Sequence, residues 1–594
     1  MTVQAKVSTH GTDLGTSANA GPFGSAATVV APVSALAYVV VTSVTDPVFV
    51  ADTPDMAVSA LGRIIGQYCN YLEPGHLLWR PSGAVMLDAF NTAQAGQQTD
   101  TVLRTSQVQL GWLAWVAGLI TIVACATWLQ RRIGNMAATF FGVAVVLLSK
   151  AFINYAQVGA SYMPALALLM VAVLLLSEED ATPVRSIAAG ACLGLSVLYW
   201  GTFVVALPAA LAAPMIFGRN ARDGFRNTVW AGLGGVTVAI ISAVWVARSL
   251  GMDSASDLAA WAGTADHGIA TGGLPRAVLG FARSYVETGD YGRIVKRFLL
   301  ADPADPVPMR ALFGFPMLGI LGFYGGMLFM LVLAFRHRDR NRLLAFFACN
   351  ALAVAAFAIF WQGGDLERYL PLVPGVALLA ATAFSAGTLA SRRVLVLLVV
   401  LMVIPNALTL GLPAVRAERD RLRSTTRDFE TPDRPMLVFS HWQDERVQFY
   451  RNYPPGAAPL SYRPYHLLTP GNNSVLDWKP RAARRILSAW DNGTSVFVSE
   501  RLVAEEPRPG WGWVEGDDLR VRWRDLHDFF TAFSYGGAAR GGVAGDGFLA
   551  LAPTPENRSL LEPYRVAATP ASPGRCSMPA VIPAMASAGS TSGR

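Results

Sequence analysis

The sequence predicts a polytopic α-helical membrane protein that ends in a small α/β domain. Three observations lead to this fold class. Hydrophobic residues make up 53% of the 594 residues and charged residues only 15%, against about 25% charged residues in a typical soluble protein. About eleven apolar runs are long enough to cross a bilayer, and the arginines between them gather in alternate connections. After residue 413 the pattern changes to short strands and helices.

The apolar runs define a transmembrane region over 25–413. The segment 1–24 before it is polar and rich in Gly, Ser, Thr and Ala. It lacks the charged and then apolar pattern of a cleaved signal, so we expect a disordered tail and a first span that is retained. The runs fall near 26–45, 108–128, 134–151, 161–177, 186–200, 202–218, 228–247, 311–335, 343–361, 368–389 and 393–412.

Arginines in the short connections indicate the orientation of the spans. With the N-terminus inside, four separate loops place their arginines on the cytoplasmic side, as the positive-inside rule expects. The net charge of +7 is explained by this placement, and without a nucleic-acid-binding motif no nucleic acid is expected as a partner. The long segments 46–107 and 248–310, and the C-terminal domain, then face outward from the plasma membrane. The four loops are Arg131-Arg132, Arg219 to Arg226, Arg336 to Arg342 and Arg392-Arg393.

The segment 414–568 is expected to form the extracytoplasmic α/β domain. Short apolar stretches in it are typical of buried strands, and strands that alternate with helices indicate an α/β arrangement. The last segment, 569–594, is rich in Ala, Pro, Ser and Gly and is expected to be disordered. Strand patterns lie at Pro435 to Ser440, Thr494 to Ser499 and Gly547 to Leu551, and a helical pattern lies around Asp444 to Tyr450.

The first outward loop holds an unusual group of carboxylates. Asp46, Asp52 and Asp55 follow directly on the first apolar run, where solubility does not require them. One interpretation is that Asp52 or Asp55 caps the helix after Pro54, because Asp is a favoured N-cap and proline suits the first helical position. The other interpretation is that this loop is the chemical centre of a membrane enzyme.

A second outward loop, Trp361 to Gly375, places Arg368 and Tyr369 at the outer mouth of a span. An arginine there can bind a phosphate group through two hydrogen bonds, while a tyrosine lies well at the membrane interface. The alternative is that both residues are only interfacial anchors.

The outward segment 248–310 carries a basic stretch that includes Arg293, Lys296 and Arg297. Apolar and basic residues alternate in it at helical spacing, as they do in helices that lie on a membrane surface. An ordinary solvated helix is the alternative.

Three segments carry a resemblance to a known superfamily. The loop motif Asp52-Thr53-Pro54-Asp55-Met56-Ala57, the topology and two later segments together resemble the GT-C membrane glycosyltransferases, in particular the protein mannosyltransferase and lipid A aminoarabinose transferase branch. That family has Asp-Glu followed shortly by Tyr-Ala in its first extracytoplasmic loop. Asp52 and Ala57 match this motif, whereas Thr53 and Met56 depart from it. The later segments, similar to the family's Gly-Leu-rich paired helices and Arg/His-Tyr-x-x-Pro turn, are Leu193 to Gly201 and Glu367 to Pro374.

The resemblance implies transfer of a sugar from a polyprenyl-phosphate donor to an extracytoplasmic acceptor, which is a cell-wall glycan, a lipid or a protein. Asp52 is the candidate general base for the acceptor hydroxyl, with Asp55 assisting it. A single activated acceptor predicts inversion at the anomeric carbon. Arg368 is the first candidate for binding the lipid phosphate, followed by Lys150 and by the basic stretch at 293–297.

Glu73 and His76 are further candidates for substrate binding in the first loop. Asp55 and Glu73 have the oxygen ligands that Mg²⁺ or Mn²⁺ prefers. Thr53 stands where the family has a carboxylate and no dense acidic cluster is present, so no metal is predicted to be required. His76 is a candidate for orienting the acceptor, or else a structural loop residue.

Two other functions compete with the glycosyltransferase. A transporter or flippase of lipid-linked sugars would place ionisable residues at midspan, yet the apolar runs have almost none there. A catalytically inactive scaffold of the same fold is the third possibility, and the departures at Thr53 and Met56 keep it open.

Overall fold

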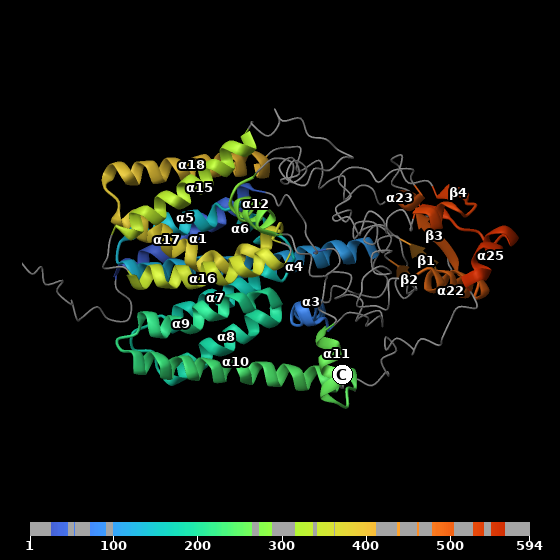
Figure 1. Ribbon diagram of the computed structural model, residues 1–594, viewed down its shortest axis with the longest axis horizontal. Coiled ribbons are helices and arrows are strands. Elements are labelled where there is room, and N and C mark those ends of the chain that lie inside the picture. Colours follow the sequence, from blue (N-terminus) through green and yellow to red (C-terminus); the bar gives the residue numbers. More distant parts are fainter. Residues whose placement is uncertain are drawn as a thin grey trace, which may run out of the picture.

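The computed structural model describes residues 25–45, 53, 72–90, 99–263, 273–287, 315–336, 341–361, 363–411, 436–439, 460–462, 478–503, 527–539 and 548–564. Its larger part is a bundle of helices that run back and forth along one direction (Figure 1). The helices of this part are α1 (Ser25–Val44), η1 (Pro74–His76), α3 (Trp79–Ala89), α4 (Thr99–Ile133), α5 (Met136–Leu147), α6 (Lys150–Tyr155), α7 (Tyr162–Leu176), α8 (Pro183–Tyr199), η2 (Gly201–Ala206), α9 (Leu207–Phe217), α10 (Ala221–Leu250), α11 (Ala255–Gly263), α12 (Gly273–Tyr285), α15 (Phe315–Phe335), α16 (Asn341–Phe360), η5 (Leu366–Leu372), α17 (Val373–Ala386) and α18 (Leu389–Gly411).

Among the described residues, five helices are long and apolar enough to cross a membrane, judged by length and composition. Shorter apolar helices accompany them, and each apolar run expected from the sequence overlaps a helix of one kind or the other. The helical membrane-protein class is therefore supported, while the number of eleven spans stays a prediction.

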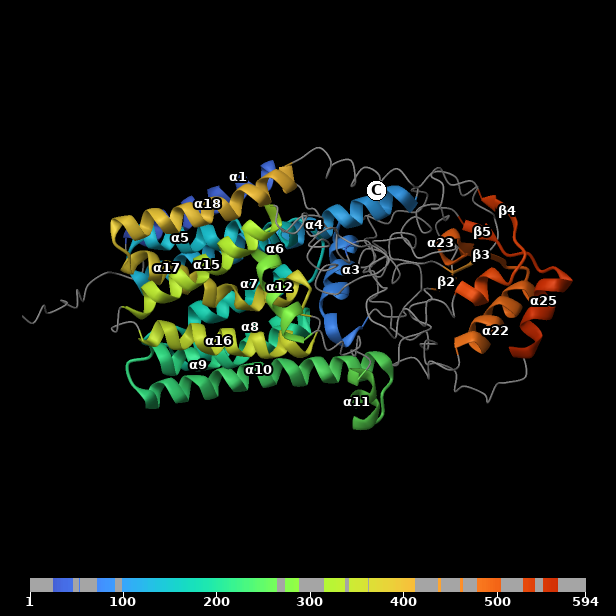
Figure 2. The same ribbon diagram turned by 45° about the horizontal axis from the view of Figure 1, so that its top comes forward.

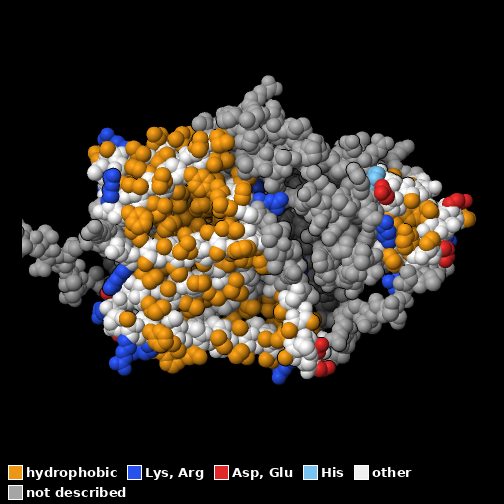
Figure 3. Space-filling view, viewed as in Figure 1, with side chains coloured by type: hydrophobic (Ala, Val, Ile, Leu, Met, Phe, Trp, Pro, Cys, Tyr) orange, Lys and Arg blue, Asp and Glu red, His pale blue; other side chains and the backbone are white. Residues whose placement is uncertain are grey.

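The surface of the bundle is apolar along its length and basic at one end. Large apolar side chains are exposed on α10 and α18, for example Ile241 at 63% and Leu397 at 57%. In the space-filling view, orange side chains cover the face in sight while Lys and Arg gather at its left end (Figure 3). Exposed apolar surface of this extent suits contact with lipid chains better than contact with water.

The expected span 134–151 is divided in the structure. α5 ends at Leu147, Ser149 is extended with φ −71° and ψ 143°, and α6 begins at Lys150. Lys150 therefore opens a separate short helix instead of ending a span. Residues on both sides of the break are apolar, so hydrophobic periodicity alone could not locate it.

α8 and α10 pack with their backbones almost in contact. A Cβ atom added at Gly190 of α8 would lie 1.8 Å from the Ala231 oxygen, and one added at Gly234 of α10 would lie 2.2 Å from the Ile187 oxygen. Small residues allow close approach of helices in a membrane, where van der Waals packing drives association.

The described part of the C-terminal region contains a five-stranded sheet with the order β2-β1-β3-β5-β4. β1 pairs in parallel with β2 and β3, and β5 pairs antiparallel with β3 and β4. Phe439, Val498 and Phe530 lie in its core with Ile486 of α22. The helical pattern expected around Asp444 to Tyr450 lies outside the described residues. The elements are β1 (Met436–Phe439), β2 (Leu460–Tyr462), α22 (Trp478–Asp491), β3 (Ser495–Ser499), α23 (Glu500–Val503), β4 (Gly536–Ala539), β5 (Phe548–Ala550), α25 (Pro555–Leu561) and η8 (Glu562–Tyr564).

Candidate active site

Five short helices meet at one end of the bundle, opposite the end where the arginines gather. η2 packs on η1 and η5, while α6 and α12 pack on η5 and on each other. Figure 2 shows α3, α6 and α12 together at this end. α6, η2 and η5 lie between apolar helices of the bundle, whereas η1 and α12 belong to the long segments 46–107 and 248–310.

Lys150 and Glu287 form a buried ion pair at this end. The Lys150 Nζ lies 2.5 Å from the Glu287 Oε2, and the two residues are 1% and 4% exposed. Lys150 was expected near the lipid phosphate, and the structure adds a carboxylate partner for it. A pair buried to this extent is costly to break, because the remaining charge would stay away from water.

Arg283 of α12 connects this pair with the loop before η5. Its Nη1 donates a 2.8 Å hydrogen bond to the Gly364 oxygen. Burial lowers the pKa of Arg283, and the nearby carboxylates of Asp365 and Glu287 oppose that shift. The site thus brings two cations from different elements close to several carboxylates.

Glu367 of η5 receives a hydrogen bond from α6. The Tyr155 hydroxyl donates to the Glu367 Oε2 at 2.7 Å. Burial raises the pKa of Tyr155, and the neighbouring Glu367 carboxylate raises it further. The hydroxyl therefore stays protonated and remains a donor to this carboxylate.

Arg368 lies between η2 and η5. Its Nη1 donates a 2.9 Å hydrogen bond to the Thr202 Oγ1, and its guanidinium carbon lies 5.4 Å from the centre of the Trp200 ring. Asp365 is 3.9 Å away, and the Arg368 side chain is 11% exposed. An arginine stacked on an aromatic ring and bonded at one nitrogen is held in one orientation.

Tyr369 is turned into the protein. It is 4% exposed, and its hydroxyl lies 2.5 Å from the Ala277 oxygen and 2.8 Å from the Gly363 oxygen. Sequence reasoning placed Tyr369 at the membrane interface as a substrate-binding residue. In this structure its hydroxyl bonds to protein backbone, and the side chain packs the 363–364 turn against α12.

Glu73 and His76 lie together at η1, in the first outward segment. The Glu73 Oε2 is 2.5 Å from the Arg80 Nη2, and the Glu73 Oε1 is 3.6 Å from the His76 Nδ1. The Leu78 backbone N–H bonds the Leu198 oxygen at 3.1 Å, which fixes η1 to the end of α8. Both predicted residues therefore belong to the same end of the bundle as Arg368.

Several predicted site residues fall outside the described residues. These are Asp52, Asp55, Arg293, Lys296 and Arg297.

Thr53, one of the two residues that depart from the family motif, lies within the described residues and is 3% exposed. A Cβ atom added at Gly159 would lie 2.8 Å from the Thr53 Cγ2 and 2.5 Å from the Leu110 Cβ. Gly159 precedes α7 at the site end of the bundle. The first outward loop therefore contacts the bundle at this end.

No group of three or more His, Cys, Asp and Glu side chains suited to a metal ion occurs within the described ranges. Glu73 is bound to Arg80, which occupies one of its oxygens. Asp55, its predicted companion, lies outside these ranges, so the choice between Mg²⁺, Mn²⁺ and no metal stays a prediction.

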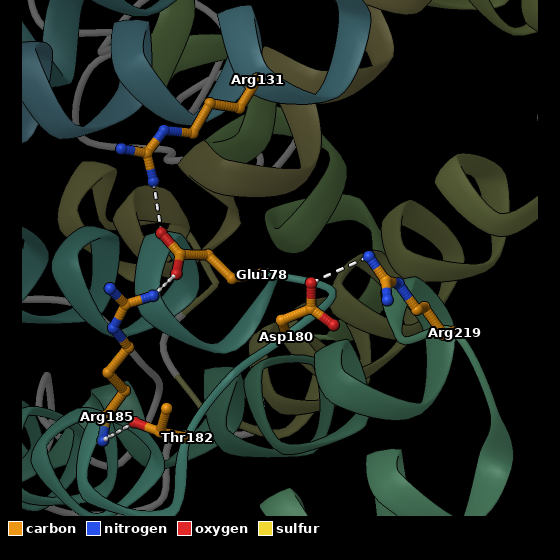
Figure 4. A network of polar contacts seen from close by, with 6 residues as sticks. All are labelled: Arg131, Glu178, Asp180, Thr182, Arg185 and Arg219. Carbon is orange, nitrogen blue, oxygen red and sulfur yellow. Dashed lines mark hydrogen bonds and ion pairs between the residues drawn. The ribbon is translucent and has the colours of Figure 1, made fainter. Parts of the chain in front are cut away.

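The opposite end of the bundle has a different polar network (Figure 4). Glu178, in the turn between α7 and α8, pairs with both Arg131 and Arg185. Asp180 of the same turn lies 2.9 Å from Arg219. These side chains are 22–71% exposed, so the network ties helix ends together at the surface.

Solved structures show which known fold this arrangement has. The first is ArnT, the aminoarabinose transferase, from Cupriavidus metallidurans in the apo state: the TM-score is 0.52 at 13% identity, over 90% of this chain and 98% of that one. The same protein bound to undecaprenyl phosphate gives a TM-score of 0.53 at 12% identity, over 89% and 98%. The chain has the GT-C fold. A weaker similarity, with a TM-score of 0.47 at 13% identity, is to the oligosaccharyltransferase AglB from Archaeoglobus fulgidus, over 89% of this chain and 74% of that one.

The GT-C fold expected from the sequence is thus confirmed over most of the chain. No protein-family model matches the sequence, and no curated protein matches it either. The similarity to the solved structures is one of fold, since their sequence identity to this chain is low.

Within this GT-C fold, sequence reasoning missed four residues of the polar cluster. Tyr155, Arg283 and Glu287 lie next to apolar segments that carried no motif, and Glu367 was part of a quoted turn without a role of its own. A carboxylate at the end of a short helix is an ordinary feature in one sequence. The sequence feature that the four residues share is their position beside the end of an apolar run. Many ionisable residues that have no such partner share this feature too.

Proposed function

We propose that this chain is a membrane glycosyltransferase that moves a sugar from a polyprenyl-phosphate donor to an extracytoplasmic acceptor. The observation that carries the proposal is Arg368, held on Trp200 and Thr202 at one end of a bundle with the GT-C fold. ArnT, which has this fold, has been solved with undecaprenyl phosphate bound. The sugar, and the choice among cell-wall glycan, lipid and protein as acceptor, are left open by these observations.

The donor phosphate is the group that this end of the bundle suits best. Arg368 and Arg283 come from η5 and α12, and both guanidinium groups already donate to neutral oxygens of the protein. A phosphate that approached them would receive charge-assisted hydrogen bonds, which are stronger than bonds to neutral acceptors. Lys150 contributes positive charge from a third element, although Glu287 offsets it. The basic stretch at 293–297 stays part of the proposal.

Unpaired polar hydrogens support a ligand with many oxygens. The Trp361 Nε1 and the Ser161 Oγ are buried without a hydrogen-bond partner among the described residues. The Trp361 ring centre lies 6.0 Å from the Arg368 guanidinium carbon, and Ser161 precedes Tyr162, whose ring packs on Trp200. Buried donors normally find acceptors, and sugar hydroxyl groups next to the phosphate would provide them.

In the proposed reaction the acceptor hydroxyl oxygen attacks the anomeric carbon of the donor sugar. The bond from this carbon to the phosphate oxygen breaks, and its electron pair leaves with the polyprenyl phosphate. Asp52 takes the hydroxyl proton as general base, assisted by Asp55. Attack opposite the leaving group inverts the anomeric centre. Glu73 and His76, which lie at the same end near η2, are the proposed acceptor-side residues.

The proposed orientation has the N-terminus in the cytoplasm and the site outside it. Arg131 and Arg219 both pair with the turn after α7, and Arg342 donates to the Gly218 oxygen, so three of the arginine-bearing loops meet at one end of the bundle. This clustering supports a single orientation under the positive-inside rule. The five-stranded sheet with its helices, which follows α18, would then be an extracytoplasmic domain.

The decisive experiment measures sugar transfer by membranes that contain the full chain and a polyprenyl-phosphate sugar. Asp52→Asn removes the proposed base and is expected to abolish transfer. Asp88→Asn, a substitution of an exposed carboxylate on α3 in the same outward segment, is the matched control and should retain transfer. Transfer that survives in Asp52→Asn would remove Asp52 as the base.

The same preparation separates the rival functions. Wild-type protein that transfers no sugar from any donor of this class, yet moves the lipid-linked sugar across vesicle membranes, is a transporter. Protein that does neither and still binds the donor is an inactive scaffold. The buried ionisable residues favour the enzyme, because Lys150, Arg283 and Glu287 lie at one end of the bundle, whereas a transport pathway needs such groups at midspan.

A further inference from the structure

The last described helix of the bundle, α18, contains a buried asparagine whose side-chain amide makes three hydrogen bonds. Asn406 is 1% exposed. Its Oδ1 accepts the Glu287 backbone N–H at 2.7 Å. Its Nδ2 donates to the Leu148 oxygen and to the Tyr285 oxygen, each at 2.8 Å. One acceptor bond and two donor bonds therefore satisfy one side chain.

The partners of Asn406 are the ends of two other helices. Leu148 directly follows α5, and Tyr285 is the last residue of α12. Carbonyl groups in the last turn of a helix have no partner within the helix, and a buried one needs a donor from elsewhere. The two hydrogens of one amide group supply that donor to both helix ends.

These two helix ends carry the buried ion pair. Leu148 is two residues before Lys150, and Glu287 is two residues after Tyr285. The backbone of Glu287 is itself bonded to Asn406. The amide thus fixes the backbone on both sides of the 2.5 Å contact between the Lys150 and Glu287 side chains, although it does not touch either charged group.

We infer that Asn406 is a positioning residue for the Lys150–Glu287 pair, and through this pair for the cationic site. Holding both backbones in place removes conformational freedom that two separate helix ends would otherwise have. Lys150 then stays directed toward Glu287 until another anion competes for it. The consequence for donor phosphate binding rests on the proposed function, whereas the positioning of the pair does not.

A double-mutant cycle in the detergent-solubilised full chain tests the inference without any activity. Glu287→Gln removes the ion pair, and Asn406→Ala removes the amide that positions it. Each single variant should lower the thermal unfolding midpoint. The loss caused by Glu287→Gln should be clearly smaller in the Asn406→Ala background, because the pair is already weakened there. Two losses that add up would mean that Asn406 only caps helix ends and would overturn the inference.

Two further variants serve as comparison. Asn406→Asp keeps the acceptor oxygen and replaces the donor with an oxygen that faces two carbonyls, so it should behave like Asn406→Ala. Asn227→Ala removes a buried asparagine of α10 that is 4% exposed. Its effect should add to that of Glu287→Gln, since Asn227 bonds neither helix end. Non-additivity of the same size in both cycles would contradict a specific role of Asn406.

Where transfer is measurable, the donor KM gives a second readout. Asn406→Ala should raise the KM for the polyprenyl-phosphate donor about tenfold, the size of one hydrogen bond to a charged group. The KM for the acceptor and kcat should change much less. A fall in kcat with an unchanged donor KM would argue against positioning of the phosphate-binding cations. Absence of transfer in wild type would instead contradict the proposed function and leave the unfolding cycle to decide.

Discussion

The Tyr155 hydroxyl donates a 2.7 Å hydrogen bond to the Glu367 carboxylate, across 212 residues of sequence. Tyr155 is 1% exposed and belongs to α6, whereas Glu367 belongs to η5. One hydrogen bond therefore joins the end of α6 to η5, which also carries Arg368.

Removing this hydrogen bond should weaken the protein measurably. Tyr155→Phe removes the buried hydroxyl that donates to Glu367, at a cost of about 1–3 kcal/mol, and should lower the thermal unfolding midpoint. Adding Glu367→Gln to Tyr155→Phe should partly restore the unfolding midpoint, because a neutral amide costs less to bury than a carboxylate. A double variant that is less stable than either single variant would contradict this account.

Arg368 should be sensitive even to replacement by lysine. A lysine cannot stack flat on Trp200 while it bonds Thr202, so Arg368→Lys is expected to raise the donor KM about tenfold or more. Arg392→Lys is the control, because Arg392 also stacks on an aromatic ring, that of Phe384 at 5.4 Å, but at the other end of the bundle. Equal effects of both variants on the donor KM would contradict a role of Arg368 in phosphate binding.

Gly280 should not tolerate any side chain. A Cβ atom there would lie 1.9 Å from the Gly363 oxygen, so Gly280→Ala must push α12 away from the 363–364 turn and disturb the Arg283 bond to Gly364. We expect a loss of about 1–3 kcal/mol in stability, measured as a lower unfolding midpoint. Gly322→Ala in α15, where a Cβ meets nothing within 4 Å, should change the midpoint little. Similar losses in both variants would rule out this steric explanation.

The surface ion pairs of Figure 4 should contribute little to the stability of the protein. Exposed ion pairs are worth about 0–1 kcal/mol and are screened by salt. Glu178→Gln is therefore expected to lower the unfolding midpoint slightly at low salt and not at all at high salt. A large loss that persists at high salt would show that this turn is more important to the fold than its exposure indicates.

Topology reporters test the orientation directly. A reporter of extracytoplasmic location fused after residue 430 should be active, and the same reporter fused after Asp339 should be inactive. In the sequence, the two positions come after α18 and after α15. Cytoplasmic location of the fusion at residue 430 would place the proposed site on the wrong side of the membrane for an extracytoplasmic acceptor.

The sequence allowed prediction of the features that depend on composition along one segment. Long apolar runs become helices because they can be buried or face lipid over their whole length, and the bundle helices lie where these runs are. The interruption at Gly201 is visible in the sequence and corresponds to η2. The break before Lys150 is not visible, because Val143 to Leu148 and Ala151 to Ile153 are equally apolar.

The polar pairs of the candidate site depend on contacts between distant segments. Nothing near Lys150 in the sequence indicates Glu287 as its partner, and nothing near Tyr155 indicates Glu367. Arg368 was recognised because it stands at the end of a span within a family-like turn, and its contacts with Trp200 and Thr202 come from the packing of η2 on η5. A single sequence records which residues are present, whereas pairing follows from how the helices pack.

In the proposed orientation, the arginines around the turn after α7 would have a role both during membrane insertion and in the folded protein. Spans that insert one after another would present Arg131 and Arg219 in separate loops, each with its full positive charge. After the helices have packed, Arg131, Arg185 and Arg219 pair with Glu178 and Asp180. Under this proposal, the acidic side chains would pair with the arginines only after insertion has set the orientation. Insertion and the folded structure would then use the same positive charges in succession.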